Sequence, residues 1–178
     1  MTMKHPYGLL ALALALAPLW SAARGAHEHG VVKLDIAVEA GKISVQMESP
    51  LDNLIGIEHA PRNDAERRRA AAAVARLRAA EALFKIDPAA GCTLAHVDLV
   101  SAPLQLGQAE PGAVDDGHAD LDGDFEFSCK DAAKAAFIDV GLFDAFDAMQ
   151  RIEVQIAAPK GQQKRTLRRP ATRITLTR

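Results

Sequence analysis

The sequence VVKLDIAVEAGKISVQMESP, residues 31–50, carries the clearest structural pattern in the chain. Apolar residues occupy every second position on both sides of a turn that contains Gly41, namely Val32, Leu34, Ile36, Val38, Ile43, Val45 and Met47. This period of two around a glycine-containing turn predicts a β-hairpin with one apolar face and one solvated face. Pro50 has no backbone N–H, so we expect it to end the second strand.

The segments that follow predict more strands and one long helix. Asn63, with Glu66 three residues later, is typical of a helix start, and residues 65–84 contain neither Gly nor Pro. We expect this helix to pack on the apolar face of the sheet, with its arginines in solvent. Alternating apolar residues predict strands within 92–100, 119–129, 138–142, 152–156 and 174–176. The predicted fold is an α+β domain, an antiparallel, sandwich-like β-sheet with one long helix packed on it.

The first 25 residues are typical of a secretory signal peptide. Lys4 precedes an almost unbroken run of Leu and Ala over residues 9–19, and the small residues within 21–25 offer cleavage sites. The run is shorter than the roughly 20 apolar residues that span a bilayer. We therefore expect export, no membrane span in the mature chain, and a single domain over residues 26–178, with a mobile tail at 26–30 and a loop at 101–117.

Composition and motifs exclude several functions. Trp20 and Tyr7 lie in the predicted signal peptide, so the mature chain lacks the side chains on which sugar, quaternary-ammonium and base-stacking sites usually depend. Without Lys4 and Arg24, 19 of the 21 basic side chains remain against 23 acidic ones, which is too acidic a balance for a nucleic-acid-binding protein. The usual hydrolase, nucleotide-binding and zinc-protease motifs are absent. We therefore expect no enzymatic activity.

Cys92 and Cys129 are the two cysteines of the chain. In an exported protein they predict a disulfide, which would stabilise the fold by about 4 kcal/mol, whereas the short Cys-x-x-Cys spacing of small zinc sites is missing. Cys129 lies on the apolar face of its predicted strand, but Cys92 has the same phase as His96 and Asp98. The pair must then lie at the end of the sheet, or a bulge must shift the register.

Histidines supply the candidate chemistry. His27 and His29 flank Glu28, and residues two apart in an extended segment project to one side. This tail could chelate Zn²⁺ or Cu²⁺, or it could be an ordinary polar tail. His118 shares the outer face of its predicted strand with Asp120, and the two could supply a nitrogen and an oxygen ligand or simply remain solvated.

Several segments together resemble the ZrgA-like family of zinc-regulated periplasmic proteins. They are residues 26–30 (AHEHG), 49–61 (SPLDNLIGIEHAP), 91–92 (GC), 118–120 (HAD), 127–129 (FSC) and 142–143 (LF), and 53–61 is the most specific part. The resemblance spans essentially the whole mature chain. It implies a non-catalytic, periplasmic zinc-binding protein that assists zinc acquisition beside an ABC-type zinc importer and its solute-binding protein.

The loop between the two cysteine strands departs from this resemblance. Better-known members carry a long insertion there that is rich in His, Asp and Glu and would hold several zinc ions. The corresponding residues here, 101–117, contain no histidine. We therefore expect a smaller metal site outside the loop rather than storage of several ions.

We hypothesise that the protein binds one Zn²⁺ in a roughly tetrahedral shell. The candidate ligands are His27 and His29, with His118 or His59, and Glu28, Glu58 or Asp120 to complete the shell or orient an imidazole. Neutral imidazole is the ligating form, so zinc affinity should fall as the pH drops below about 6.5. His59 could instead serve only to orient the start of the helix.

Two other functions stay open. The first is a metal-free cell-envelope interaction protein, in which residues 53–61 form a structural corner. The second is a copper-binding protein, because cleavage after Gly25 would leave a free amine beside His27 that can bind Cu²⁺.

Overall fold

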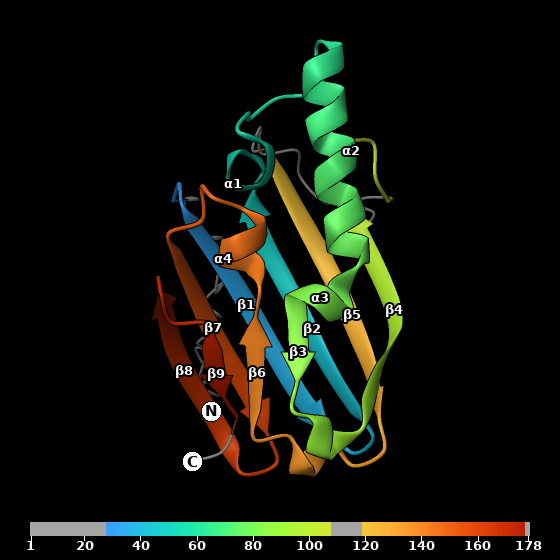
Figure 1. Ribbon diagram of the computed structural model, residues 1–178, viewed down its shortest axis with the longest axis vertical. Coiled ribbons are helices and arrows are strands. Elements are labelled where there is room, and N and C mark those ends of the chain that lie inside the picture. The colour runs from blue at the N-terminus through green and yellow to red at the C-terminus, as the bar shows by residue number, and fades with distance from the viewer. Residues whose placement is uncertain (1–27, 108–118, 177–178) are drawn as a thin grey trace, which may run out of the picture.

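The computed structural model describes residues 28–107 and 119–176, which are mainly β-strands (Figure 1). The strands are β1 (Val31–Glu39), β2 (Lys42–Pro50), β3 (Phe84–Ile86), β4 (Cys92–Val100), β5 (Asp120–Cys129), β6 (Phe137–Val140), β7 (Arg151–Ala158), β8 (Gly161–Arg168) and β9 (Arg173–Thr175). The helices of these ranges are α1 (Leu51–Ile55), α2 (Asp64–Arg78), α3 (Ala80–Leu83) and α4 (Leu142–Ala145), with 3₁₀ turns η1 (Pro88–Ala90) and η2 (Ala132–Lys134). The predicted signal peptide, His27 and His118 lie outside the described residues.

The predicted hairpin forms the centre of the larger sheet. β1 and β2 pair antiparallel up to Glu39 opposite Lys42, and Gly41 takes the left-handed φ of 77° that the tight turn requires. The strand order is β4-β5-β2-β1-β7-β8, and every pair of neighbours is antiparallel except β1 and β7. The sheet is therefore mixed rather than wholly antiparallel as predicted, because β7 returns to the free edge of β1 through a long crossover.

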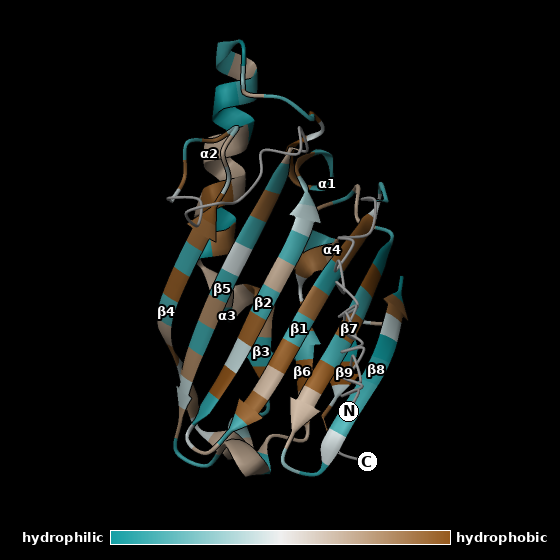
Figure 2. Cartoon of the chain, turned by 180° about the vertical axis from the view of Figure 1, so that it is seen from behind, coloured by the Kyte–Doolittle hydropathy of each residue, from teal (hydrophilic) through white to brown (hydrophobic). Residues whose placement is uncertain are grey.

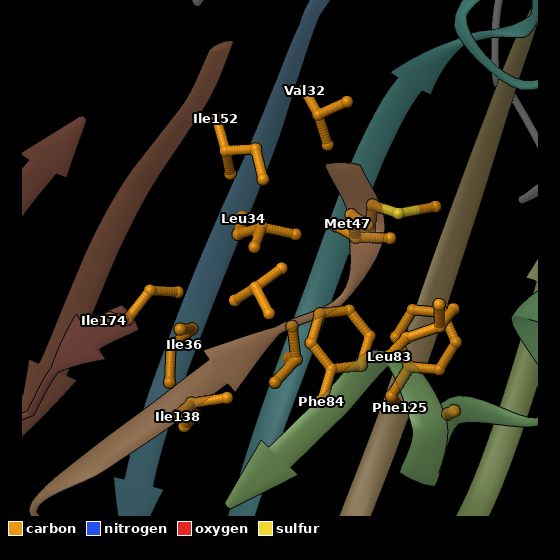
Figure 3. Packing of buried hydrophobic residues seen from close by; sticks show 14 of the residues in the cluster. Val32, Leu34, Ile36, Met47, Leu83, Phe84, Phe125, Ile138, Ile152 and Ile174 are labelled. Carbon is orange, nitrogen blue, oxygen red and sulfur yellow. The ribbon is translucent and has the colours of Figure 1, made fainter. Parts of the chain in front are cut away.

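The apolar face of this sheet is covered by a second sheet, with the order β3-β6-β9. The alternating apolar residues of the hairpin are at most 8% exposed. Phe84, Ile138 and Ile174 of the second sheet point into the same core, and the ring of Phe84 lies 5.0 Å from that of Phe125 (Figure 3). Polar and apolar residues alternate along the central strands of the larger sheet (Figure 2). These two packed layers confirm the sandwich-like fold.

The helix that the sequence predicts begins as expected but ends early. Asn63 caps α2, since its Oδ1 accepts the backbone N–H of Glu66 at 3.0 Å. α2 ends at Arg78, and the chain continues through α3 into β3, which pairs with β6. The prediction of one helix up to residue 84 is therefore wrong, because Phe84 pairs as a strand residue instead.

The predicted position of this helix also needs correction. In α2, only Ala70, Ala73 and Leu77 are buried, and much of the helix extends beyond the end of the sheet (Figure 1). These mostly small side chains provide little surface for packing on a sheet. The second sheet, rather than the helix, covers the middle of the apolar face (Figure 3).

Strand β8 has no counterpart among the predicted elements. It pairs with β7 along its whole length and forms an edge of the larger sheet. Leu167 is its one buried residue, and Figure 2 shows the strand as mostly hydrophilic. Nearly all of its side chains are exposed, polar or charged, as is typical of an edge strand, so its sequence carries no alternation of apolar residues.

A disulfide joins Cys92 and Cys129, which lie opposite each other where β4 begins and β5 ends. The register of the two strands shifts between Leu94 and His96. Both of the expected arrangements therefore occur, since the pair lies at the end of the sheet and a bulge changes the phase of β4. This end of the sheet is opposite the end at which β2 leads into α1 (Figure 1).

Candidate metal centre

Three side chains with metal-ligating atoms meet at the end of the sheet beside α1. His29 precedes β1, Asp52 lies in the first turn of α1, and Glu58 follows that helix. The Nδ1 atom of His29 is 2.5 Å from Oδ2 of Asp52, and its Nε2 atom is 3.3 Å from Oε1 of Glu58. The three ligand atoms lie within 4.8 Å of one another. We call these residues the His29 cluster.

The local sequence explains how Asp52 and Glu58 come to the same place. Pro50 ends β2 and directly precedes α1, which places Asp52 at the end of the sheet. Gly56 ends α1 with a left-handed φ of 73°, and its N–H donates to the carbonyl oxygen of Asp52 at 2.8 Å. The chain therefore reverses after little more than one helical turn, and Glu58 comes within reach of His29.

The backbone beside His29 is held by several elements. Gly30 has a φ of 77°, and its carbonyl oxygen accepts the N–H groups of Gln150 and Arg151 at 2.8 and 2.9 Å. Its own N–H donates to the side chain of Asn53 at 2.7 Å. His29 is thus attached to a backbone that β1, α1 and the start of β7 fix together.

The charges of the cluster favour a cation at its centre. The hydrogen bond to Asp52, the negative charge of Asp52 and that of Glu58 raise the pKa of His29 above its ordinary value of 6.5. The second carboxylate oxygen of Asp52, Oδ1, is buried and has no hydrogen-bond partner among the described residues. A buried carboxylate oxygen without a partner is unfavourable, and a bound cation would satisfy it.

The donor set suits zinc. One imidazole nitrogen and two carboxylate oxygens are ligand types that Zn²⁺ accepts, at about 2.0–2.2 Å. Both ring nitrogens of His29 face carboxylate oxygens, so a proton on the ring takes the place that a metal ion would occupy. A single zinc ion would bind one ring nitrogen in its neutral form, so metal binding would replace the contact at that nitrogen with a coordinate bond and release the proton.

The structure brings together two of the predicted ligands, His29 and Glu58, and adds Asp52. Glu28 pairs instead with Arg151, its Oε2 atom lying 2.6 Å from Nη2. Sequence reasoning missed Asp52 as a ligand. The available signal was its position directly after Pro50-Leu51, in the segment 49–61 that carries most of the resemblance.

The remaining candidates are placed as follows. The Nδ1 atom of His59 contacts the carbonyl oxygen of Ala60 at 2.9 Å, and His59 is not part of the His29 cluster. Asp120 is the first residue of β5 and pairs with Pro50, the last residue of β2, which leads directly into α1. His27 and His118 lie outside the described residues, so their part in the site stays a prediction.

Comparison with known proteins gives one family. Residues 26–176 match the profile of a family described as ZrgA family zinc uptake protein. No curated protein matches the chain. The matched range contains the whole His29 cluster and both cysteines. In the part of the chain that the structure describes, no helix has the length and apolar character needed to cross a membrane.

Proposed function

The chain belongs to the ZrgA family of zinc uptake proteins, and we propose that it binds one Zn²⁺ at the His29 cluster. The protein then acts as a non-catalytic, periplasmic zinc-binding protein that assists zinc uptake. The observation that carries this proposal is that His29, before β1, meets Asp52 and Glu58 of the segment 49–61, together with the unpartnered Oδ1 atom of Asp52.

The exposure of the cluster supports a site that exchanges its zinc. The side chains of His29 and Glu58 are 68% and 55% exposed, whereas that of Asp52 is 22% exposed. Structural zinc sites are usually closed by four protein ligands. With three donors and two of them open to solvent, this site can accept a ligand from water or from another protein. Such an arrangement fits a protein that hands zinc on.

The fourth ligand is proposed from the sequence. His27 lies two residues before His29, and His118 directly precedes Ala119, whose carbonyl oxygen accepts the N–H of Leu51 at 2.7 Å. The chain thus enters β5 next to the start of α1. We propose that His27 or His118 completes the shell, with Asp120 as the oxygen alternative, and that His59 orients the chain before α2.

The proposed recipient is the solute-binding protein of an ABC-type zinc importer. A single exposed site with mixed nitrogen and oxygen ligands can lose its ion through stepwise ligand exchange. Transfer is tested by mixing the zinc-loaded protein with a zinc-free solute-binding protein and separating the two. Zinc that stays with the donor at equal concentrations would contradict this role.

Isothermal titration calorimetry on protein purified after export tests the proposed site. We expect one Zn²⁺ per chain for the wild type and a large loss of affinity for His29→Ala, Asp52→Asn and Glu58→Gln. The control is His96→Ala, which removes an exposed histidine of β4 that is outside the cluster. Wild-type affinity in the three cluster variants would overturn the proposed site.

A further inference from the structure

Asn53 is a buried polar residue directly beside the His29 cluster. It lies in α1 and is 2% exposed. Its side-chain Oδ1 atom accepts the backbone N–H of Gly30 at 2.7 Å, and its Nδ2 atom donates to the carbonyl oxygen of Val31 at 2.9 Å. One amide therefore satisfies a donor and an acceptor on the backbone where β1 begins.

The Asn53 amide is one of the groups that hold the backbone at Gly30. The carbonyl oxygen of Gly30 already accepts the N–H groups of Gln150 and Arg151, and Gly30 is buried. If the Asn53 amide were removed, the N–H of Gly30 would lose its acceptor in a buried place, which is unfavourable. The chain would then move until water or another group reached that N–H.

Such a movement would act on the metal ligands because of their positions in the sequence. His29 directly precedes Gly30, and Asp52 directly precedes Asn53. The hydrogen bond between Gly30 and Asn53 therefore ties the backbones of the two ligands together, one residue away from each. The His29 ring is largely exposed, so little packing fixes it apart from its carboxylate partners.

We infer that Asn53 is a positioning residue of the zinc site. This inference rests on the proposed function. By holding Gly30 and Val31 against α1, Asn53 keeps His29 within reach of Asp52 before the metal arrives. Zinc then binds to a site whose donors are already close together, and less ordering accompanies binding. Groups that orient metal ligands typically contribute about 10- to 100-fold to metal affinity.

The test compares Asn53→Ala with Asp87→Ala. Asp87 also accepts two backbone N–H groups, those of Ala89 and Ala136, both at 3.0 Å. It lies between β3 and η1, and β3 runs toward the end of the molecule opposite α1 (Figure 1). Zinc alone is the probe, and its affinity is measured by competition with a chelator dye. We expect about tenfold weaker zinc binding for Asn53→Ala, with one ion still bound, and unchanged affinity for Asp87→Ala.

A second readout needs no metal. NMR titration of the His29 ring in the zinc-free protein should give a pKa closer to the ordinary value in Asn53→Ala than in the wild type, because the ring has moved away from Asp52. A merely structural role would lower the melting temperature and leave the His29 titration unchanged. Asn53→Ser is the milder variant, with the same expected direction, if Asn53→Ala does not fold.

The outcomes separate this inference from the proposed function. If wild type binds zinc, His29→Ala does not, and folded Asn53 variants bind as tightly as wild type, the positioning role is overturned and the proposed site stands. If His29→Ala binds zinc like the wild type, the proposed site itself fails, and the role of Asn53 fails with it.

Discussion

Replacement of Gly30 by alanine should disturb both the fold and the metal site. A non-glycine residue at the φ of 77° found here is disfavoured by about 1–2 kcal/mol. The added Cβ would also lie 2.9 Å from Cγ and 3.2 Å from Cβ of Gln150. Both atoms lie at the base of the Gln150 side chain, and the backbone N–H of Gln150 is held by the carbonyl oxygen of Gly30, so relieving this contact should cost about 1–3 kcal/mol. We expect Gly30→Ala to lower the free energy of unfolding by about 2–5 kcal/mol.

Gly41→Ala is a matched control for this substitution. Gly41 has the same φ of 77°, but a Cβ there would meet nothing nearer than the carbonyl oxygen of Cys129, at 3.8 Å. It lies in the β1–β2 turn, at the end of the sheet opposite α1. Gly41→Ala should therefore lose only the backbone contribution of about 1–2 kcal/mol.

Urea unfolding of the two zinc-free variants measures these losses, and calorimetry measures their zinc affinity. Gly30→Ala should bind zinc about tenfold more weakly, because His29 moves relative to Asp52, whereas Gly41→Ala should bind zinc like the wild type. If both variants lose the same stability and both keep wild-type affinity, the backbone at residue 30 does not set the geometry of the site and the reasoning is refuted.

Three further predictions concern the disulfide, the pH and the core. Replacing both Cys92 and Cys129 by alanine opens a link between residues 37 positions apart and should cost about 4 kcal/mol in urea unfolding without changing zinc affinity. In the zinc-free protein, the pKa of His29 is raised in the folded state, so the ionised ring stabilises the fold fully below pH 6.5. This stabilisation is lost as the pH rises through the raised pKa. An NMR titration of His29 with parallel urea unfolding checks this pH dependence. Phe84→Ala removes a ring that packs on Phe125 and should lower the unfolding free energy by about 3–5 kcal/mol in the same assay.

The structure places the loss of zinc affinity at a higher pH than the sequence alone predicts. The ordinary pKa of histidine places the loss of zinc affinity below about pH 6.5. Because Asp52 and Glu58 raise the pKa of His29, the proton competes with zinc at a higher pH than that. Calorimetry in buffers with different ionisation enthalpies should show proton release on zinc binding near neutral pH.

The parts of the fold that can be predicted from the sequence are those with a local periodic signal. Apolar residues alternate with a period of two in the hairpin around Gly41 and in the strands that contain Phe125 and Val154, so burial on one face is visible in the chain itself. β8 carries no such signal, since almost all of its side chains are exposed and only its backbone pairing with β7 places it in the sheet. The parallel pairing of β1 with β7 joins distant segments, and no local pattern encodes it.

The end of α2 could not be predicted for a different reason. Residues 65–84 are rich in Ala, Arg and Leu, which favour a helix wherever the chain allows one. The helix stops because Phe84 and Ile86 pair with β6 as strand residues, and Phe84 is buried against Phe125. Tertiary contacts of this kind override propensity.

The sequence predicts the types of residue that form the metal site, but it identifies only some of the particular residues. His29 and Glu58 stand out in the sequence because a histidine beside an acidic residue is a recognisable ligand pattern. Asp52 and Asn53 do not stand out in this way. Their roles depend on α1, which brings Asp52 to His29 and Asn53 to Gly30, each pair 23 positions apart in the sequence. The backbone hydrogen bonds that hold Gly30 are equally invisible before the fold is known.

The central claim is that zinc is bound by the His29 cluster, and a crystal structure of the zinc-loaded protein tests it most directly. Anomalous diffraction at the zinc edge locates the ion without reference to the protein. We predict one zinc at about 2.0–2.2 Å from an imidazole nitrogen of His29 and from carboxylate oxygens of Asp52 and Glu58. Zinc bound elsewhere, with His29 still paired with Asp52 and Glu58, would contradict the claim.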